Sequence, residues 1–221
     1  MLAPVIPVKR LAAAKGRLAP DLHPVERRVL AIAMFEDVVA AVQATTGLAA
    51  PVVVSPDREV WRRAEALRCR VVEEDGDGDL NAAVRRATPA AGDQARGVAV
   101  VAADLPLATP DALGRVRDAL AAAPVVVVPS ADGGGTNVLG WRPPARFEPR
   151  FGPGSAGRHA ALPGALRLEL PELALDVDTP ADLRAVLGRL DPGTVTARRA
   201  RDLGLAARLA AGLQPDRGRP D

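Results

Sequence analysis

The sequence predicts an α/β fold in which a mostly parallel β-sheet lies between two layers of helices. Short apolar runs alternate along the chain with segments whose apolar residues recur at helical spacing. The apolar residues are mostly Ala, Val and Leu, with three Phe, two Trp and no Tyr, which suits strands buried on both faces. With 221 residues, of which 48% are hydrophobic, the chain is long enough for one large domain with a full core.

In the first third of the chain, prolines and glycines mark the ends of the expected elements. Leu2–Val8 is predicted to be a short strand, interrupted by proline. Pro24 begins a long helix, since apolar residues follow it every three or four positions, and Gly47 ends this helix. Pro51–Val54 is the second expected strand. The dipeptide Ser55-Pro56 then begins a helix, because proline is favoured at the first helical position.

The middle of the chain repeats the alternation of strand and helix. Arg70–Val72 is a short expected strand, followed by an acidic loop at Glu73–Asp79 and a helix from about Leu80. Val98–Ala102 is the clearest strand, because it is a continuous apolar run. Thr109-Pro110 is a helix-capping pair, so the next helix is expected to extend from there to about residue 122.

The last part of the expected domain contains three further strands. These are Pro124–Val128, Asn137–Trp141 and Leu173–Val177, with a glycine- and proline-rich stretch at Arg142–Gly157 between the second and the third. Thr179-Pro180 begins a final helix that extends to about residue 190. The pattern supports one domain over residues 1–190.

Residues 191–221 are predicted to be a C-terminal extension that is partly disordered. Gly204–Ala211 is compatible with one more helix. Gln214–Asp221 is composed mainly of Pro, Gly, Arg and Asp and offers no apolar face, so this segment is expected to be disordered.

Charge and composition exclude several classes of function. The isoelectric point is about 9.3, but the formal net charge is only +2, and no run of five like charges occurs. Aromatic residues make up 2% of the chain, which leaves few stacking platforms for single-stranded nucleic acid. Apolar stretches are too short for a signal peptide or a membrane span. We therefore expect a cytoplasmic protein that binds neither nucleic acid nor membrane, with its single Cys69 a buried and inert thiol.

Acidic residues follow two of the expected strands. Asp104 comes after Val98–Ala102, while Asp176 and Asp178 end the strand Leu173–Val177, where alternate residues share a face. Three converging carboxylates would repel one another without a cation, and oxygen ligands beside phosphates indicate Mg²⁺. The residues alone support ordinary surface carboxylates equally well, because a capping box explains the neighbouring Thr179.

The segment after the first strand is basic. Lys9, Arg10, Lys15 and Arg17 lie at a transition from loop to helix, where cations beside free N–H groups suit a triphosphate. The segment lacks the Walker A pattern, and a solvated basic helix face is the commoner explanation for such a pattern.

Two glycine-rich segments are the remaining candidates. Asp132–Asn137 contains Thr136 and is also compatible with a plain hairpin turn. Phe151–His159 contains a glycine loop, a serine at a candidate helix start and then Arg and His, which is the composition of an anion pocket. His159 is compatible with either a substrate-lining or a structural role.

Taken in order, these motifs resemble the 2-phospho-L-lactate/phosphoenolpyruvate guanylyltransferase family. The matching segments are PVKRLAAAKGRL, Leu80-Asn81-Ala82-Ala83, Asp104-Leu105-Pro106, Gly135-Thr136-Asn137, PRFGPGSAGRH and LDVDTP. The resemblance implies a three-layer Rossmann-like nucleotidyltransferase fold with a mostly parallel mixed sheet. It also implies transfer of GMP from GTP to phosphoenolpyruvate or 2-phospho-L-lactate, with release of pyrophosphate, in biosynthesis of the deazaflavin coenzyme F-420.

The resemblance also implies roles for individual residues. Asp104, Asp176 and Asp178 would be catalytic and hold magnesium. The phospho-acid would contact Thr136, Gly152 and Ser155. The nucleotide would contact Lys9, Lys15, Arg17 and Asn81. Gly16 departs from the family pattern, in which a hydroxyl residue often stands between the lysine and the arginine.

Other interpretations stay open at this point. One is a molybdenum-cofactor or sugar-phosphate nucleotidyltransferase, although such enzymes typically begin with a glycine-rich loop where this chain has alanines. Another is a non-catalytic nucleotide-binding protein on the same fold. The sequence does not decide which three-carbon phospho-acid is used, nor the oligomeric state, a homodimer included.

Overall fold

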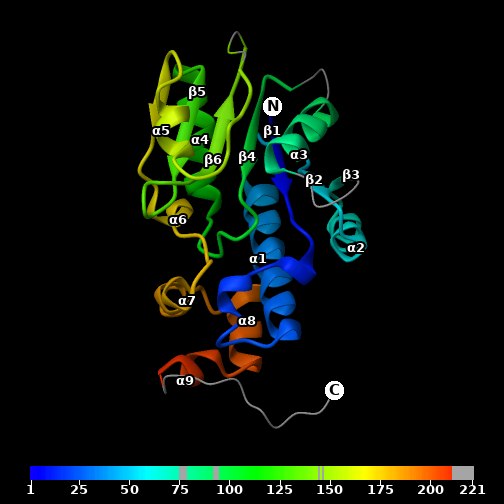
Figure 1. The fold of residues 1–221 in the computed structure, drawn as a ribbon. Helices are drawn as coiled ribbons and strands as arrows, with labels where there is room; N and C mark the ends of the chain where they lie inside the picture. The colour runs from blue at the N-terminus through cyan, green and yellow to red at the C-terminus, as the bar shows by residue number, and fades with distance from the viewer. Residues whose placement is uncertain (75–78, 92–94, 144, 146, 211–221) are drawn as a thin grey trace.

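A seven-stranded mixed sheet forms the centre of the computed structural model, which describes residues 1–74, 79–91, 95–143, 145 and 147–210 (Figure 1). The strand order is β3-β2-β1-β4-β6-β5-β7. Strand β6 is antiparallel to its neighbours β4 and β5, and every other pair is parallel. The expected mostly parallel mixed sheet is therefore confirmed. The strands are Leu2–Pro7 (β1), Val52–Ser55 (β2), Arg70–Glu73 (β3), Gly97–Val101 (β4), Val125–Pro129 (β5), Thr136–Trp141 (β6) and Ala165–Arg167 (β7).

Helices cover both faces of this sheet, and the C-terminal helices lie below it in Figure 1. The α-helices are Pro24–Ala44 (α1), Arg58–Ala66 (α2), Leu80–Ala87 (α3), Pro110–Ala122 (α4), Ser155–Ala160 (α5), Pro171–Ala174 (α6), Pro180–Leu187 (α7), Val195–Asp202 (α8) and Leu205–Ala210 (α9). Short 3₁₀ turns occur at Leu11–Ala13, Gly16–Leu18 and Thr88–Ala91.

The strands are buried on both faces because their side chains alternate between two helical layers. In β1 and β2, Ile6 and Val53 share a buried cluster with residues of α1, α2 and α4. Their neighbours Val5 and Val52 share a second cluster with residues of α3. Helix α5 packs against β5 on the same side as α3. This arrangement is the three-layer architecture expected from the sequence.

The C-terminal helices pack around the lower half of α1 (Figure 1). Leu205 of α9 and Ala200 of α8 share a buried cluster with Leu30 and Met34 of α1 and with Leu183 of α7. Residues 195–210 are thus part of a common core, and α8 was not expected from the sequence. The domain boundary at residue 190 stays a prediction. The predicted disorder of 214–221 lies outside the described residues.

A carboxylate of α1 holds the N-terminus of α8. The backbone N–H groups of Val195 and Thr196 donate to the two oxygens of Asp37, at 2.7 and 2.8 Å. These N–H groups have no partner within the helix itself, so the carboxylate satisfies them and complements the helix dipole.

Asp37→Ala is therefore expected to destabilise the protein by about 1–2 kcal/mol, the usual cost of losing a helix cap. Urea unfolding of the full chain measures this difference. Asp118→Ala is the matched control, since the Asp118 side chain is 68% exposed and pairs with its neighbour Arg117. An equal loss of unfolding free energy in both variants would show that the contact between Asp37 and α8 does not stabilise the protein.

The predicted strand Leu173–Val177 is wrong. Pro171 begins the short helix α6, and the segment that follows is extended without joining the sheet. The Asn137 amide donates to the carbonyls of Leu173 and Ala174, at 3.1 and 2.8 Å, which occupies the end of α6. The edge position next to β5 belongs to β7, which the sequence did not indicate.

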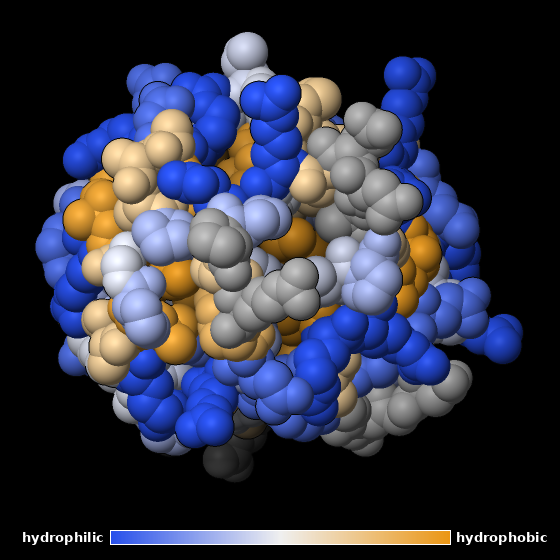
Figure 2. All heavy atoms as spheres, turned by 90° about the horizontal axis from the view of Figure 1, so that it is seen from above, coloured by the Kyte–Doolittle hydropathy of each residue, from blue (hydrophilic) through white to orange (hydrophobic). Residues whose placement is uncertain are grey.

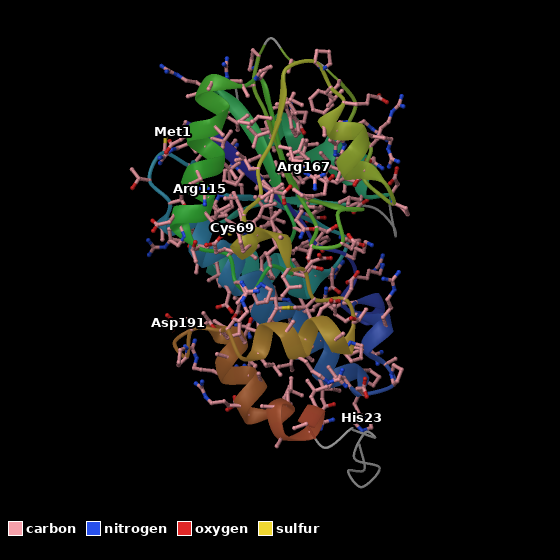
Figure 3. All side chains as sticks on the ribbon, turned by 90° about the vertical axis from the view of Figure 1, so that its left-hand side faces the viewer. Met1, His23, Cys69, Arg115, Arg167 and Asp191 are labelled. Atoms are coloured by element: carbon pink, nitrogen blue, oxygen red, sulfur yellow. The ribbon has the colours of Figure 1, made fainter. Side chains whose placement is uncertain are left out.

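Few large apolar side chains are exposed in the described ranges. Large apolar side chains that stay exposed in the described ranges are Met1, Val25 and Leu166, and hydrophilic residues surround much of the face seen in Figure 2. None of the described helices has the length and hydropathy needed to cross a membrane. Cys69, labelled in Figure 3, is 9% exposed, and burial raises the pKa of its thiol to about 11, as expected of an inert cysteine.

Candidate active site

A pocket of about 910 Å³ lies at the carboxyl ends of β1 and β4. In the sheet, β2 and β3 lie on the outer side of β1, and β6 and β5 lie on the outer side of β4, so the strand order reverses between β1 and β4. Ligands of open parallel sheets bind at such a reversal of strand order, because the loops on either side diverge and leave a crevice. Lys9, Lys15 and Arg17 line this pocket from the β1 side, and Asp104 from the β4 side.

Three carboxylates converge at one end of the pocket. One oxygen from each of Asp104, Asp176 and Asp178 lies within 4.8 Å of the others. The Val177 N–H donates to the carbonyl of Asp104 (3.2 Å), and the Asn137 amide donates to the Asp176 carboxylate (3.2 Å). The expected convergence is present, but loop contacts produce it, since Asp176 and Asp178 lie outside the sheet.

Burial raises the pKa of Asp176, and the negative charge of Asp104 raises it further. The hydrogen bond from Asn137 acts in the opposite direction and is outweighed. Ionisation of Asp176 is thus costly in the folded protein. A cluster with this property attracts positive charge.

The ammonium group of Lys15 supplies positive charge to this cluster. Its Nζ lies 2.5 Å from Oδ2 of Asp104 and 3.3 Å from Oδ1 of Asp178. Burial alone would lower the pKa of Lys15, but Asp104, with Asp178 as a smaller cause, raises it above its ordinary value. Lys15 also has a φ of 55°, an uncommon conformation for a side chain larger than glycine and one often found at functional sites.

The donor set fits a small divalent cation. All three ligands are carboxylate oxygens, which Mg²⁺ prefers, and they are close enough to share one ion after small side-chain adjustments. The capping box formed by Thr179 and Asp182 is present at the start of α7, as expected. It accounts for those two residues but not for the convergence of Asp104, Asp176 and Asp178.

The residues expected to bind the phospho-acid lie around Thr136, on the wall of the pocket. Thr136 and Gly152 both line the pocket, and Gly152 has a φ of 120°, which favours glycine. Ser155 is the first residue of α5, as expected, but its side chain is buried behind the wall. Its hydroxyl lies 3.0 Å from that of Thr136.

The residues expected to bind the nucleotide occupy three different environments. Lys9 is exposed at the pocket, and Arg17 is 77% exposed with its guanidinium 3.9 Å from Asp178. Asn81 is engaged elsewhere: the Phe151 N–H donates to its Oδ1 (2.7 Å), and its amide donates to the Phe151 carbonyl (3.4 Å). This pairing holds the start of α3 next to the loop that contains Gly152.

Two residues received no definite role from the sequence. Asn137 connects the end of α6 to Asp176, and His159 lies behind Thr136, with its Nδ1 3.0 Å from the threonine hydroxyl. Both belong to motifs noticed in the sequence, but their partners are distant along the chain, so spacing carried no signal. The other histidine, His23, lies at the start of α1, at the lower end of the molecule in Figure 3.

Comparison with known proteins identifies the family. Residues 2–208 match the family model described as guanylyl transferase CofC like. The chain belongs to this family. It is 41% identical to phosphoenolpyruvate guanylyltransferase of Thermomonospora curvata, a match that covers 97% of this chain and 93% of that protein. It is 42% identical to the enzyme of the same name from Nocardia farcinica, over 93% of both chains.

Solved structures show the same fold. A protein of Desulfovibrio desulfuricans described as a nucleotide-diphospho-sugar transferase superposes with a TM-score of 0.73 at 16% identity, covering 94% of this chain and 96% of that one. A nucleotidyl transferase of Methanothermobacter gives a TM-score of 0.58 at 18% identity, covering 86% and 97% of the two chains. The CofC-like protein is therefore a nucleotidyltransferase in fold and in family.

Proposed function

We propose that this CofC-like protein transfers GMP from GTP to phosphoenolpyruvate and releases pyrophosphate, as a step in coenzyme F-420 biosynthesis. A phosphate oxygen of the acid forms a bond to the α-phosphorus of GTP, and the bond from that phosphorus to the bridging oxygen of pyrophosphate breaks. The observation that carries the proposal is a pocket with a charged end and an adjoining wall that offers a hydroxyl group and a glycine-rich loop. Carboxylates and Lys15 lie at one end, and the hydroxyl of Thr136 and the Gly152 loop lie beside it.

This division of the pocket suits two anionic substrates. Lys15, with Lys9 and Arg17 nearby, would bind the triphosphate and neutralise the charge that develops on pyrophosphate. Thr136 and the Gly152 loop would hold the phospho-acid. Mg²⁺ bound by Asp104, Asp176 and Asp178 would neutralise phosphate charge during the transfer.

No general base is needed for the attack. The second pKa of a phosphate monoester is about 6, so the attacking oxygen is already ionised near neutral pH. Catalysis then depends on holding two polyanions in line and on neutralising their charge. The residues at the pocket supply cations, carboxylates and hydrogen-bond donors, which is the set that such a reaction requires.

The proposal is tested by incubating the purified full chain with GTP, MgCl₂ and one acid at a time, and measuring pyrophosphate together with the mass of the nucleotide product. The acids are phosphoenolpyruvate, 2-phospho-L-lactate and 3-phosphoglycerate. We expect release with phosphoenolpyruvate to exceed that with the other two, and to fall sharply when ATP or CTP replaces GTP.

Two outcomes would contradict the proposal. Turnover with molybdopterin or a sugar 1-phosphate, and none with the three acids, would support the rival nucleotidyltransferases. GTP binding without turnover of any acceptor would support a non-catalytic nucleotide-binding protein.

A further inference from the structure

A chain of three hydrogen bonds runs behind the pocket wall from the backbone of Arg150 to the hydroxyl of Ser155. The Arg150 N–H donates to Nε2 of His159 (3.0 Å), and Nδ1 of His159 lies 3.0 Å from Oγ1 of Thr136. That oxygen lies 3.0 Å from Oγ of Ser155. His159 and Ser155 are 2% and 1% exposed, whereas Thr136 lines the pocket. Thr136 is therefore the member of this chain that a ligand meets.

The contact with Arg150 determines which nitrogen of His159 carries the proton. A backbone N–H can only donate, so Nε2 must accept, and the proton of the neutral ring lies on Nδ1. Burial, with the charge of Arg158 as a smaller cause, lowers the pKa of His159 to about 4, so the ring is neutral at physiological pH. The Nδ1–H group therefore donates to Thr136.

The surroundings hold the ring and the loop in this arrangement. The Arg158 guanidinium donates to the carbonyls of Pro153 and Arg150, at 2.8 and 3.1 Å, which fixes the loop that presents the Arg150 N–H. The ring of Phe151 packs edge-on against the imidazole, with 5.2 Å between the ring centres.

These contacts leave the pocket as the place where the Thr136 hydroxyl can donate its proton. A hydroxyl has two acceptor positions and one proton, and His159 occupies the first acceptor position. Within the described part of the chain, Thr136 is the hydrogen-bond partner of the buried Ser155 hydroxyl. If Ser155 donates its proton to the second acceptor position of Thr136, both hydroxyl groups are satisfied. The proton of Thr136 is then left for the pocket.

The opposite tautomer would reverse this pattern. If Nδ1 of His159 were an acceptor, the Thr136 hydroxyl would donate its proton to the imidazole, and Ser155 would donate its proton to Thr136. A lone pair of the threonine would then face the pocket and repel an anion. The position of one proton on a buried ring thus decides whether this wall attracts or repels a phosphate or carboxylate.

We propose that His159 is a positioning residue that makes the Thr136 hydroxyl an obligate hydrogen-bond donor to an anionic oxygen of the phospho-acid. Ser155 completes the arrangement by filling the second acceptor position. The inference rests on the proposed function in one respect, namely that the acid lies against Thr136.

The tautomer can be tested without any substrate. ¹⁵N chemical shifts of the protein labelled in histidine distinguish a proton on Nδ1 from one on Nε2, and His159→Gln assigns the signals, since His23 is the other histidine. We expect the proton on Nδ1 at pH 7. A proton on Nε2 would overturn the inference even in an enzyme that uses phosphoenolpyruvate. A proton on Nδ1 in a protein that turns over no phospho-acid would instead contradict the proposed function.

Two substitutions separate the two nitrogens of the ring. In His159→Asn the side-chain amide can replace Nδ1 and donate to Thr136, while the acceptor for Arg150 is lost. In His159→Gln the amide oxygen can replace Nε2 and accept from Arg150, while the donor to Thr136 is lost. We expect the Gln variant to raise KM for the acid about ten- to a hundredfold, with KM for GTP and the thermal midpoint nearly unchanged. The Asn variant should lower the thermal midpoint and keep KM for the acid within about threefold.

A double-mutant cycle provides the second readout. In a Thr136→Val background, His159→Gln should add less than about threefold to KM for the acid, because its effect acts through the missing hydroxyl. His23→Gln, at the distant start of α1, is the matched control and should leave KM unchanged. Fully additive losses in the cycle, or equal changes in KM for acid and GTP, would assign His159 a merely structural role.

Discussion

Asp176→Asn is expected to abolish guanylyl transfer and at the same time to raise the thermal stability of the metal-free protein. Asparagine keeps the shape of the side chain. Its amide oxygen can still accept the hydrogen bond that Asn137 now donates to Asp176 over 3.2 Å. The substitution removes a negative charge that the proposed Mg²⁺ would need as a ligand, and this ion would neutralise the two anionic substrates. We expect kcat to fall on the order of a thousandfold or more.

The gain in stability follows from the direction of the pKa shift. Burial and the charge of Asp104 raise the pKa of Asp176 in the folded protein, so the folded state binds its proton more tightly than the unfolded state does. Ionisation of Asp176 therefore carries a stability penalty that develops as the pH rises through the interval between the unfolded and the folded pKa. Asparagine has no such penalty, and we expect a midpoint several degrees higher in EDTA.

Asp104→Asn is the matched comparison. It should lose as much activity, but it should destabilise the protein by about 1–3 kcal/mol, because the Lys15 ammonium, with its side chain 7% exposed, loses its nearest carboxylate. Calorimetry in EDTA and pyrophosphate release in MgCl₂ measure the two properties separately. Near-normal turnover by Asp176→Asn would rule out the carboxylate cluster as the catalytic centre, and equal stability of the two variants would contradict the charge distribution described above.

Lys15→Met is expected to change metal binding and turnover in opposite directions. In the nucleotide-free protein, the lysine ammonium lies among the carboxylates and opposes a second cation there. Two unit charges 4 Å apart interact by about 4 kcal/mol at an effective dielectric constant of 20, so its removal should tighten Mn²⁺ binding by about tenfold or more. Isothermal titration calorimetry without nucleotide measures this affinity.

The same substitution should lower kcat/KM for GTP by about a hundredfold, since the lysine would otherwise bind the triphosphate and the leaving pyrophosphate. Methionine has a side chain of similar length to lysine but carries no charge, so the comparison isolates the effect of the charge. Arg17→Met is the control, because the Arg17 side chain is 77% exposed and 3.9 Å from Asp178, and we expect less than about a threefold change in Mn²⁺ affinity. Weaker Mn²⁺ binding by Lys15→Met would show that the lysine supports the metal site instead of opposing metal binding.

Hydrophobic periodicity and helix-boundary residues were enough to predict much of the fold. The runs at Val98–Val101 and Val125–Val128 are buried strands, and Pro24, Pro110 and Pro180 begin helices where expected. These features are local: a strand or a helix start depends on a few adjacent residues, and so it can be recognised in the sequence. The order of the motifs was also enough to indicate the family.

The run Leu173–Val177 shows where local information fails. Four of its five residues are apolar, and Leu173 and Val177 are indeed fully buried. Burial of an apolar run is compatible with a strand or with a loop, because the hydrophobic effect is not directional. The choice depended on the Asn137 amide, which holds the end of α6 from another strand. The edge strand β7 and the packing of α8 on α1 likewise depend on partners distant in the sequence.

The site divides in the same way. The sequence indicated the residue types that are proposed to carry the chemistry, namely three aspartates, basic side chains after β1 and a glycine-rich loop, because these types recur at recognisable spacing. The tertiary structure alone decided that Lys15 pairs with the carboxylates, that Ser155 lies behind Thr136, and that Asn81 pairs with the backbone of Phe151. Each of these contacts is a directional interaction over about 3 Å between segments far apart in the chain, so only the folded geometry determines which partner a polar side chain finds.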